Sequence, residues 1–273
     1  LMTAFTPDAD GNAANVGKLL FGKNASGDAQ DWYILGRDKG VQGENTVIFA
    51  ASPMKENVLF NDKEGKTYVE DYGTYTDDNP TEVNANHYGA SNLRAVLQSM
   101  AGDTNYFSDI EQKLMQATTV ITKDEKIEKD YTTTDKLYAP AGDYGAVILK
   151  VASDNSMLLQ RSAYWSKEEF WLRSPNYQDG LKTSNDAYYT SLKKQNVQYM
   201  RVHFTYSVRP ATNLDLSNVL FASAATCNDG TINIGEAMTL RLDGKNKDIG
   251  TVTYNASTKK IKVDKGNTTD RVY

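Results

Sequence analysis

Histidine and cysteine, the side chains that most often carry metal or redox chemistry, are scarce in this chain. Its 273 residues include two histidines, His87 and His203, and one cysteine, Cys227. A zinc site built on histidines this far apart in the sequence would need carboxylates to complete it. Oxidation by a cysteine pair is excluded, because only one thiol is present. The sequence therefore predicts no catalytic metal and no cofactor.

One acidic segment has the spacing that begins a calcium loop. Asp8, Asp10 and Asn12 place oxygen ligands at alternate positions. A complete loop of that kind has glycine at its sixth position and glutamate at its twelfth. Here those positions hold Ala13 and Leu19. The segment fits an Asx turn better, and it stays only a weak calcium candidate.

Two segments have features of hydrolase sites. Residues 89–93 read GASNL, with Leu93 where a nucleophile elbow needs glycine. Ser91 fits the N-cap of a helix instead. Glu168 and Glu169 are adjacent, so on a strand they point to opposite faces and cannot act as a pair. No catalytic constellation is predicted, although an unrecognised hydrolase stays open as an alternative.

The composition excludes two classes of partner. The net charge is -5 and the pI is about 5.2, whereas a nucleic-acid-binding face is basic. No apolar run approaches the length of about 18 residues that a membrane span needs, so no membrane insertion is predicted. Tyrosine is frequent, with 17 residues against 8 phenylalanines. Its flat ring and polar tip suit both sheet surfaces and contact surfaces.

Helical spacing and capping residues predict two helices in the middle of the chain. After Ser91, apolar residues at 93, 96, 97 and 100 follow a helical period, and Gly102 ends the pattern. Ser108 and Glu111 form the capping box of a second helix, which continues through Leu114 and Met115. We expect these helices to pack on a sheet.

Apolar runs and alternation predict strands elsewhere. We expect them over residues 17–21, 32–36, 46–51, 118–122 and 186–204, the last interrupted by a turn. Residues 146–151 fit a strand or a short helix. Residues 61–86 lack periodicity and are interpreted as a functional loop or a poorly ordered segment. The charged residues 123–136 are interpreted as a second loop. The sequence thus indicates an α+β fold.

Two segments late in the chain form a recognisable pair. Residues 170–175 read FWLRSP, and residues 206–216 read YSVRPATNLDL. The pair resembles an uncharacterised extracellular domain common in surface proteins of gut Gram-positive bacteria. More widely, the segments are similar to the closing strands of C-type-lectin-like folds and their formylglycine-generating relatives. That resemblance implies a lectin-like, mainly antiparallel sheet with two helices preceding the tryptophan strand.

The signature residues have a structural interpretation. Alternation places Trp171 and Arg173 on the face opposite Phe170 and Leu172, and we expect Trp171 to anchor the core against the helices. Arg173 and Arg209 are expected to fork onto carboxylates or backbone carbonyls. Two prolines, Pro175 and Pro210, are each expected to end a strand, because proline donates no ladder hydrogen bond.

The composition changes near residue 222. Residues 223–273 carry a net charge of +2, which leaves -7 on residues 1–222. We expect the lectin-like α+β domain over residues 1–222. Residues 223–273 should form a small β-domain of immunoglobulin-like character, short for a complete sandwich. Within it, residues 255–258 fit a hairpin turn that places the strand at 252–254 opposite 261–263.

The resemblance implies an extracellular or cell-wall-attached, non-catalytic module that forms part of a longer multidomain chain. A glycan or a surface protein is the expected partner. Loops on the rigid scaffold, residues 70–87 and 177–186, are the expected binding surface. The candidate ligand-binding residues are Tyr72, Tyr75, Tyr88, Tyr177, Asp179 and Asp186. A structural spacer that holds an effector domain away from the cell wall is the alternative of another class.

Overall fold

The computed structural model describes most of the chain up to residue 224 and three short strands beyond it. The described ranges are residues 18–37, 45–62, 66–68, 73–75, 82–143, 146–150, 156–158, 169–178, 181–194, 196–215, 219–224, 238–242, 251–255 and 260–264. Several predicted features lie outside these ranges: Asp8, Asp10, Asn12, Tyr72, Asp179 and Cys227.

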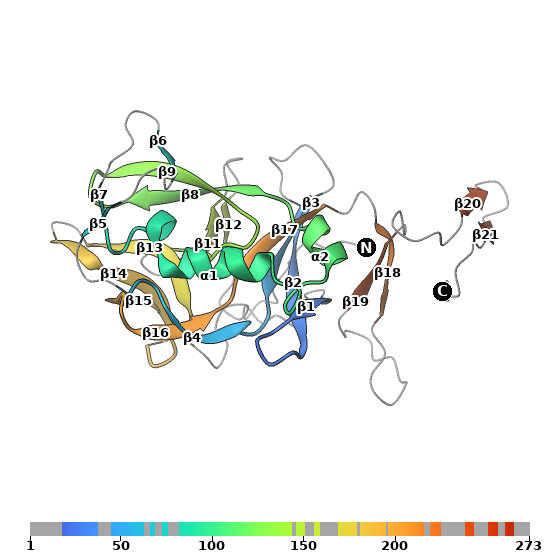
Figure 1. Ribbon diagram of the computed structural model, residues 1–273, viewed down its shortest axis with the longest axis horizontal. Coiled ribbons are helices and arrows are strands. Elements are labelled where there is room, and N and C mark those ends of the chain that lie inside the picture. The colour runs from blue at the N-terminus through green and yellow to red at the C-terminus, as the bar shows by residue number, and fades with distance from the viewer. Residues whose placement is uncertain are drawn as a thin grey trace.

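A six-stranded sheet joins segments from both ends of the described chain (Figure 1). Its strands, in spatial order, are β17 (Ala211–Asp215), β3 (Asn45–Ala50), β2 (Ala29–Arg37), β1 (Lys18–Lys23), β19 (Met238–Leu242) and β18 (Val219–Ala224). The β1–β19 pair is parallel and the other pairs are antiparallel. Strand β17 thus closes the sheet by returning to β3, which lies more than 150 residues earlier.

The remaining described strands form small antiparallel sheets. One three-stranded sheet contains β6 (Thr74–Tyr75), β9 (Lys129–Asp135) and β8 (Thr118–Asp124). A second contains β10 (Ala141–Asp143), β11 (Ala146–Lys150) and β12 (Ser156–Leu158). A third contains β13 (Trp171–Gln178), β14 (Leu181–Ser191) and β15 (Asn196–Arg201). Two-stranded pairs contain β4 (Lys55–Leu59) and β16 (Thr205–Val208), β5 (Lys66–Tyr68) and β7 (Glu82–Asn84), and β20 (Thr251–Asn255) and β21 (Lys260–Asp264).

Two α-helices occupy the predicted positions. Helix α1 (Asn92–Ala101) begins at the Ser91 side chain, which accepts a hydrogen bond from the Arg94 N–H, and ends at Gly102. Helix α2 (Asp109–Leu114) begins with the predicted capping box of Ser108 and Glu111. Figure 1 shows α1 between the β8–β9 ribbon and the β4–β16 pair. Neither helix is long and apolar enough to cross a membrane. With two short helices and mainly antiparallel strands, the described fold is α+β in the broad sense.

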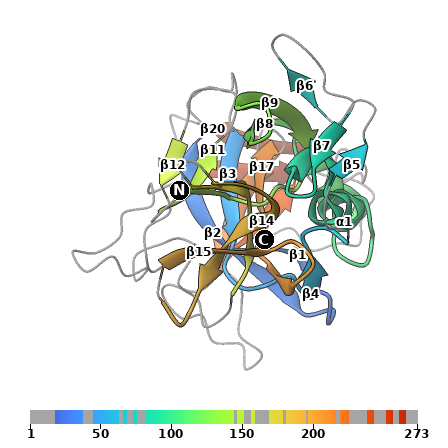
Figure 2. The same ribbon diagram turned by 90° about the vertical axis from the view of Figure 1, so that its left-hand side faces the viewer.

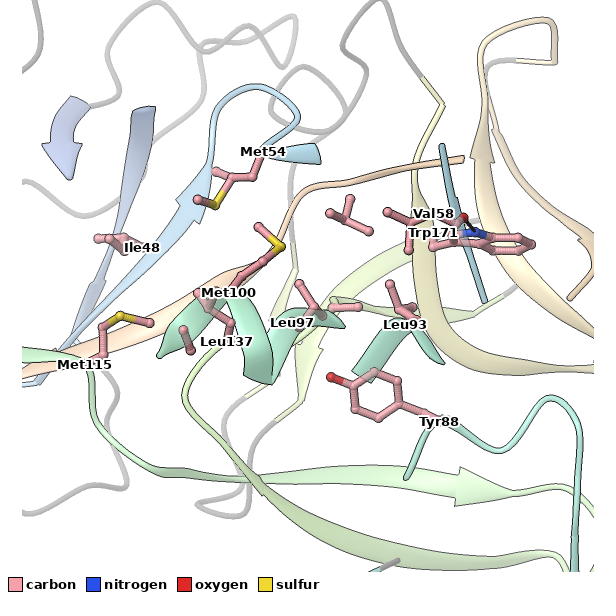
Figure 3. Packing of buried hydrophobic residues seen from close by; sticks show 14 of the residues in the cluster. Ile48, Met54, Val58, Tyr88, Leu93, Leu97, Met100, Met115, Leu137 and Trp171 are labelled. Carbon is pink, nitrogen blue, oxygen red and sulfur yellow. Dashed lines mark hydrogen bonds between the residues drawn. The ribbon is translucent and has the colours of Figure 1, made fainter. Parts of the chain in front are cut away.

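Alternation along β13 divides the core into two clusters. Trp171 packs in the larger cluster with Leu93 and Leu97 of α1, and its indole Nε1–H donates to the Val58 carbonyl at 2.8 Å (Figure 3). Phe170 and Leu172 belong to the second cluster. The predicted burial of Trp171 is therefore confirmed, and so is the opposite placement of its neighbours.

Four local expectations were wrong. Residues 61–86 are not a loop throughout, because they include the short strands β5, β6 and β7. The described residues of the predicted loop 177–186 belong to the end of β13 and the start of β14.

Residues 123–136 are not a loop, because β8 continues to Asp124 and β9 fills most of the remainder. The inward-facing positions of β9 include Thr133 and Asp135, so polar residues hid the alternation of the strand. Pro175 does not end a strand either. It pairs with Ala187 inside β13, where the register shifts on both sides and relieves the need for a proline N–H.

The C-terminal strands agree with the hairpin predicted from the sequence. Val252 pairs with Val263, and Tyr254 pairs with Ile261. Strand β18 runs through residue 222 and joins β19. The domain boundary placed at that residue stays a prediction.

Replacing Trp171 with alanine should lower the free energy of unfolding by about 3–5 kcal/mol, because a fully buried indole and its hydrogen bond are lost together. Phe204→Ala is the matched control: this ring is 47% exposed, and its loss should change stability by less than about 0.5 kcal/mol. Urea unfolding monitored by circular dichroism measures both. Equal stability of Trp171→Ala and the wild-type protein would contradict the core assignment.

Candidate functional site

The predicted ligand-binding residues lie in different environments. Tyr75 in β6 is half-buried, and Asp186 in β14 is partly exposed. Tyr88 is fully buried in the 3₁₀ turn Tyr88–Ala90, where its ring packs in the core (Figure 3). A ring in that position cannot stack on a ligand at the surface. Tyr177 lies in β13 and pairs with Lys182.

Tyr75 and His87 form a hydrogen-bonded relay with Asp124 of β8. The Ala90 N–H donates to Nδ1 of His87 at 3.3 Å, which leaves the proton of the neutral ring on Nε2. That Nε2 lies 2.6 Å from the Tyr75 hydroxyl, which donates to Oδ2 of Asp124 at 2.8 Å. The relay attaches the segment around β6 to the end of β8.

Tyr75 and His87 also stack on the ring of Tyr131. The ring of Tyr131 in β9 stacks on His87 at 4.1 Å between centroids and on Tyr75 at 5.3 Å. The Tyr131 hydroxyl accepts a hydrogen bond from the Gly89 N–H at 3.0 Å. Tyr75 is therefore fixed both through its hydroxyl and through its ring.

Burial keeps the relay uncharged at His87 and Tyr75. Desolvation lowers the pKa of His87 to about 4, although Asp124 opposes the shift and Arg94 adds to it. The pKa of Tyr75 is raised, first by burial and then by its hydrogen bond to Asp124. At neutral pH the imidazole is neutral and the phenol keeps its proton. The polar groups of the relay therefore hydrogen-bond to one another. Neither His87 nor Tyr75 has a pKa near 7, so neither is suited to transfer a proton at neutral pH.

A second polar contact joins the two predicted binding loops. The amide of Asn86 donates to Oε2 of buried Glu125 at 2.8 Å and to the Asp186 carbonyl at 2.9 Å. Asn86 comes from the end of the first loop, residues 70–87, and Asp186 from the end of the second, residues 177–186. The ends of both loops thus lie side by side, in the part of the molecule that faces the viewer in Figure 2.

Backbone contacts extend this junction. The Asn61 side chain donates to the Ala85 carbonyl at 3.0 Å, and its N–H donates to the Val202 carbonyl at 3.1 Å. The Val202 N–H in turn donates to the Asn185 carbonyl at 2.8 Å. Four separate segments are therefore held together at the base of the loops.

The buried arginines of the signature have the predicted structural role. Arg173 donates to the carbonyls of Ala139 and Ile121 at 2.7 and 3.1 Å. Arg209 donates to the carbonyls of residues 50 and 51 at 3.0 and 3.2 Å. Both side chains fork onto backbone carbonyls, and Pro210 separates β16 from β17 as expected. Because these side chains are buried, they support the scaffold rather than its surface.

The sequence did not reveal the partners of Tyr75. The spacing of the two histidines predicts an isolated His87, and no sequence pattern marks Asp124 or Asn86. Asp124 is 49 residues from Tyr75 and Asn86 is 100 residues from Asp186, so no local spacing links them. The one available signal was the position of Tyr75 and His87 in the same aperiodic loop. Within the described residues, no group of three histidine, cysteine or carboxylate side chains is arranged to hold a metal ion.

Comparison with known proteins identifies one family. A family model described as "Domain of unknown function (DUF6273)" matches residues 54–216, more than half of the chain. No curated protein and no solved structure matches the chain. The expectation of an uncharacterised domain is thereby confirmed, whereas the match does not bear on the signature or on a lectin-like fold.

The protein should lose stability between about pH 6.5 and pH 4 because of His87. The unfolded chain binds a proton near the ordinary pKa of 6.5, whereas the folded ring does so only near 4. Protons therefore favour the unfolded state across this window, and the full loss amounts to about 3 kcal/mol. Unfolding in urea at several pH values measures it. His87→Gln should flatten the dependence, and His203→Gln should retain it. Identical pH profiles for both variants would contradict the assignment.

Proposed function

The chain belongs to the DUF6273 family, and we propose that it acts as a non-catalytic ligand-binding module. The proposed binding surface lies where Asn86 and Asp186 join the ends of the segments 70–87 and 177–186. Its main support is the partly buried Tyr75 side chain, which is fixed by Asp124, His87 and Tyr131. A ring that is already ordered loses little conformational entropy on binding, and this increases affinity.

The hydrogen-bond pattern supports binding over catalysis. His87 is neutral and buried, and Tyr75 keeps its proton at neutral pH. A general acid or base works best with a pKa near the working pH, and the pKa of each group is shifted away from it. The relay is better suited to holding a loop than to transferring protons.

The proposed architecture is lectin-like over residues 1–222 and immunoglobulin-like over residues 223–273. The first proposal is supported by the return of β17 to β3 and by the two helices that precede β13. The second is supported by the antiparallel β20–β21 hairpin. Fold alone does not determine function, so these proposals are independent of the ligand.

The resemblance of the signature segments supports a place outside the cell. We propose an extracellular or cell-wall-attached domain within a longer chain, with a glycan or a surface protein as its partner. The frequent tyrosines and the asparagine and aspartate residues of both loops offer ring faces and hydrogen bonds to hydroxyl groups.

A glycan and cell-wall-fragment array, probed with the full chain, tests the proposal. A ligand that binds and is recovered at its original length supports a binding module. A fragment that is shortened during incubation would indicate the alternative hydrolase. Absence of binding to every fragment would favour the structural spacer.

Two substitutions at Tyr75 should separate ring stacking from folding. Both Tyr75→Phe and Tyr75→Leu remove the hydroxyl and its bond to Asp124, so both should lower the melting temperature, and Tyr75→Leu should lower it further because it also loses the stack on Tyr131. Only the leucine variant lacks a flat ring. Its affinity for a glycan found on the array should be at least about tenfold weaker than that of Tyr75→Phe. Calorimetric titration measures this difference, and equal affinities would place the ligand elsewhere.

A further inference from the structure

The β14–β15 hairpin presents an exposed surface that the proposed binding loops do not include. Three large apolar side chains are exposed on it or next to it: Leu192 at 39%, Tyr199 at 42% and Phe204 at 47%. They span the segment from the β14–β15 turn to the turn after β15. Most large apolar residues of the described chain are buried, so this group is unusual.

The same segment has a charge opposite to that of the chain. Residues 192–204 include three basic residues and no acidic residue, whereas the whole chain has a net charge of -5. Lys193, Lys194 and Arg201 are all exposed. Two carboxylates lie nearby: Asp186 is opposite Arg201 in the register, and Glu169 accepts a hydrogen bond from the Leu192 N–H at 3.1 Å. The basic side chains outnumber them, so the surface favours an anionic partner.

Strand addition by a peptide is disfavoured at this edge. In the described part of the chain, β15 is the outer strand of the sheet β13–β14–β15. Its own side chains occupy the main chain at Val197: the N–H donates to Oδ1 of Asn196, and the carbonyl accepts from Nε2 of Gln198, both at 2.8 Å. An extended peptide needs a row of unpaired main-chain groups. A ligand is therefore expected to contact the exposed side chains of β15 rather than its main-chain N–H and C=O groups.

Aromatic and basic side chains alternate at Tyr199, Arg201 and Phe204, an arrangement that suits the successive sugar rings of a glycan. Tyr199 and Arg201 are two residues apart on β15, so they project from the same face. Phe204 follows in the next turn, where its ring contacts His203 at 5.0 Å between centroids. Flat rings beside cations offer stacking and charge-assisted hydrogen bonds together.

We propose that the exposed side chains at the turn of the β14–β15 hairpin and at the far end of β15 bind an anionic glycan chain. This inference rests on the proposed function and defines its ligand class. Arg201 lies opposite Asp186, at the end of β15 where Asn86 joins the two loops. The binding surface thus consists of Tyr199 and Arg201 beside the loop junction and of Lys193 and Lys194 at the other end of β15, with Val197 buried between them.

Matched polysaccharides test this inference on the full chain. Polygalacturonic acid is compared with its methyl ester, and dextran sulfate with dextran, so that each pair differs in charge. Poly-L-glutamate provides negative charge without sugar rings. Binding measured by biolayer interferometry should be at least about tenfold tighter for an anionic polysaccharide than for its neutral counterpart or for polyglutamate, and it should weaken as salt is added.

Surface substitutions localise the interaction. Lys193→Gln with Lys194→Gln, and separately Tyr199→Ala with Phe204→Ala, should each weaken binding by at least about tenfold. The matched control is Lys23→Gln with Lys113→Gln, which removes two exposed charges from β1 and α2. These elements lie to the right of β14 and β15 in Figure 1, near the middle of the molecule. The control should bind within about twofold of the wild-type protein.

The outcomes separate this inference from the proposed function. If polyglutamate binds as tightly as the anionic polysaccharides, the binding is general charge attraction and the inference is overturned. The same follows if the Lys23→Gln, Lys113→Gln control loses as much affinity as the Lys193→Gln, Lys194→Gln variant. Binding to neutral glycans alone, with loss in Tyr75→Leu, would overturn it while the proposed function stands. If neither these polysaccharides nor any array fragment binds, both proposals fail.

Discussion

Buried peptide groups must be hydrogen-bonded, and this requirement governs the whole structure. The described strands form one six-stranded sheet and several sheets of two or three strands. At the edges of such small sheets, some backbone carbonyl groups have no neighbouring strand to donate a hydrogen bond to them. Each of these buried carbonyls would destabilise the fold if it had no other donor. Side chains supply the missing donors: Arg173 reaches Ala139 and Ile121, Arg209 reaches residues 50–51, and Trp171 reaches Val58.

Arginine suits this role better than other donors, although its charge is unfavourable in the interior. Burial lowers the pKa of Arg173, but the intrinsic value of guanidinium is so high that the group stays charged. Arg209 is also stabilised by the faces of Phe49 and Phe170, which lie 4.7 and 4.9 Å from its guanidinium carbon. One fork spans two carbonyls, so a single side chain joins segments that no strand connects. Lysine has neither the planar fork nor the same ability to stack.

Features determined by neighbouring residues could be predicted from the sequence, whereas distant contacts could not. Both helices and their caps at Ser91 and Ser108 follow from local spacing. The alternation around Trp171 placed it correctly in the core. Hydrophobic alternation does not reveal strand β9, because two of its inward positions, Thr133 and Asp135, are polar. Asp135 accepts hydrogen bonds from Arg94 of α1 and from Thr133 in the same strand. A hydrophobic pattern in the sequence does not reveal a strand face whose buried side chains are polar and hydrogen-bonded.

The candidate site follows from the same requirement. The lack of apolar periodicity marks residues 70–87 in the sequence, but the relay and the Asn86 junction depend on contacts between residues 12 to 100 positions apart. Asn86 and Asn61 supply donors for carbonyls at Asp186 and Ala85, as the arginines do in the core. Satisfying these buried groups fixes the bases of both loops beside β15. A surface assembled in this way can vary at Lys193, Lys194 and Tyr199 while the hydrogen bonds of Asn61 and Asn86 stay constant, because these are different residues.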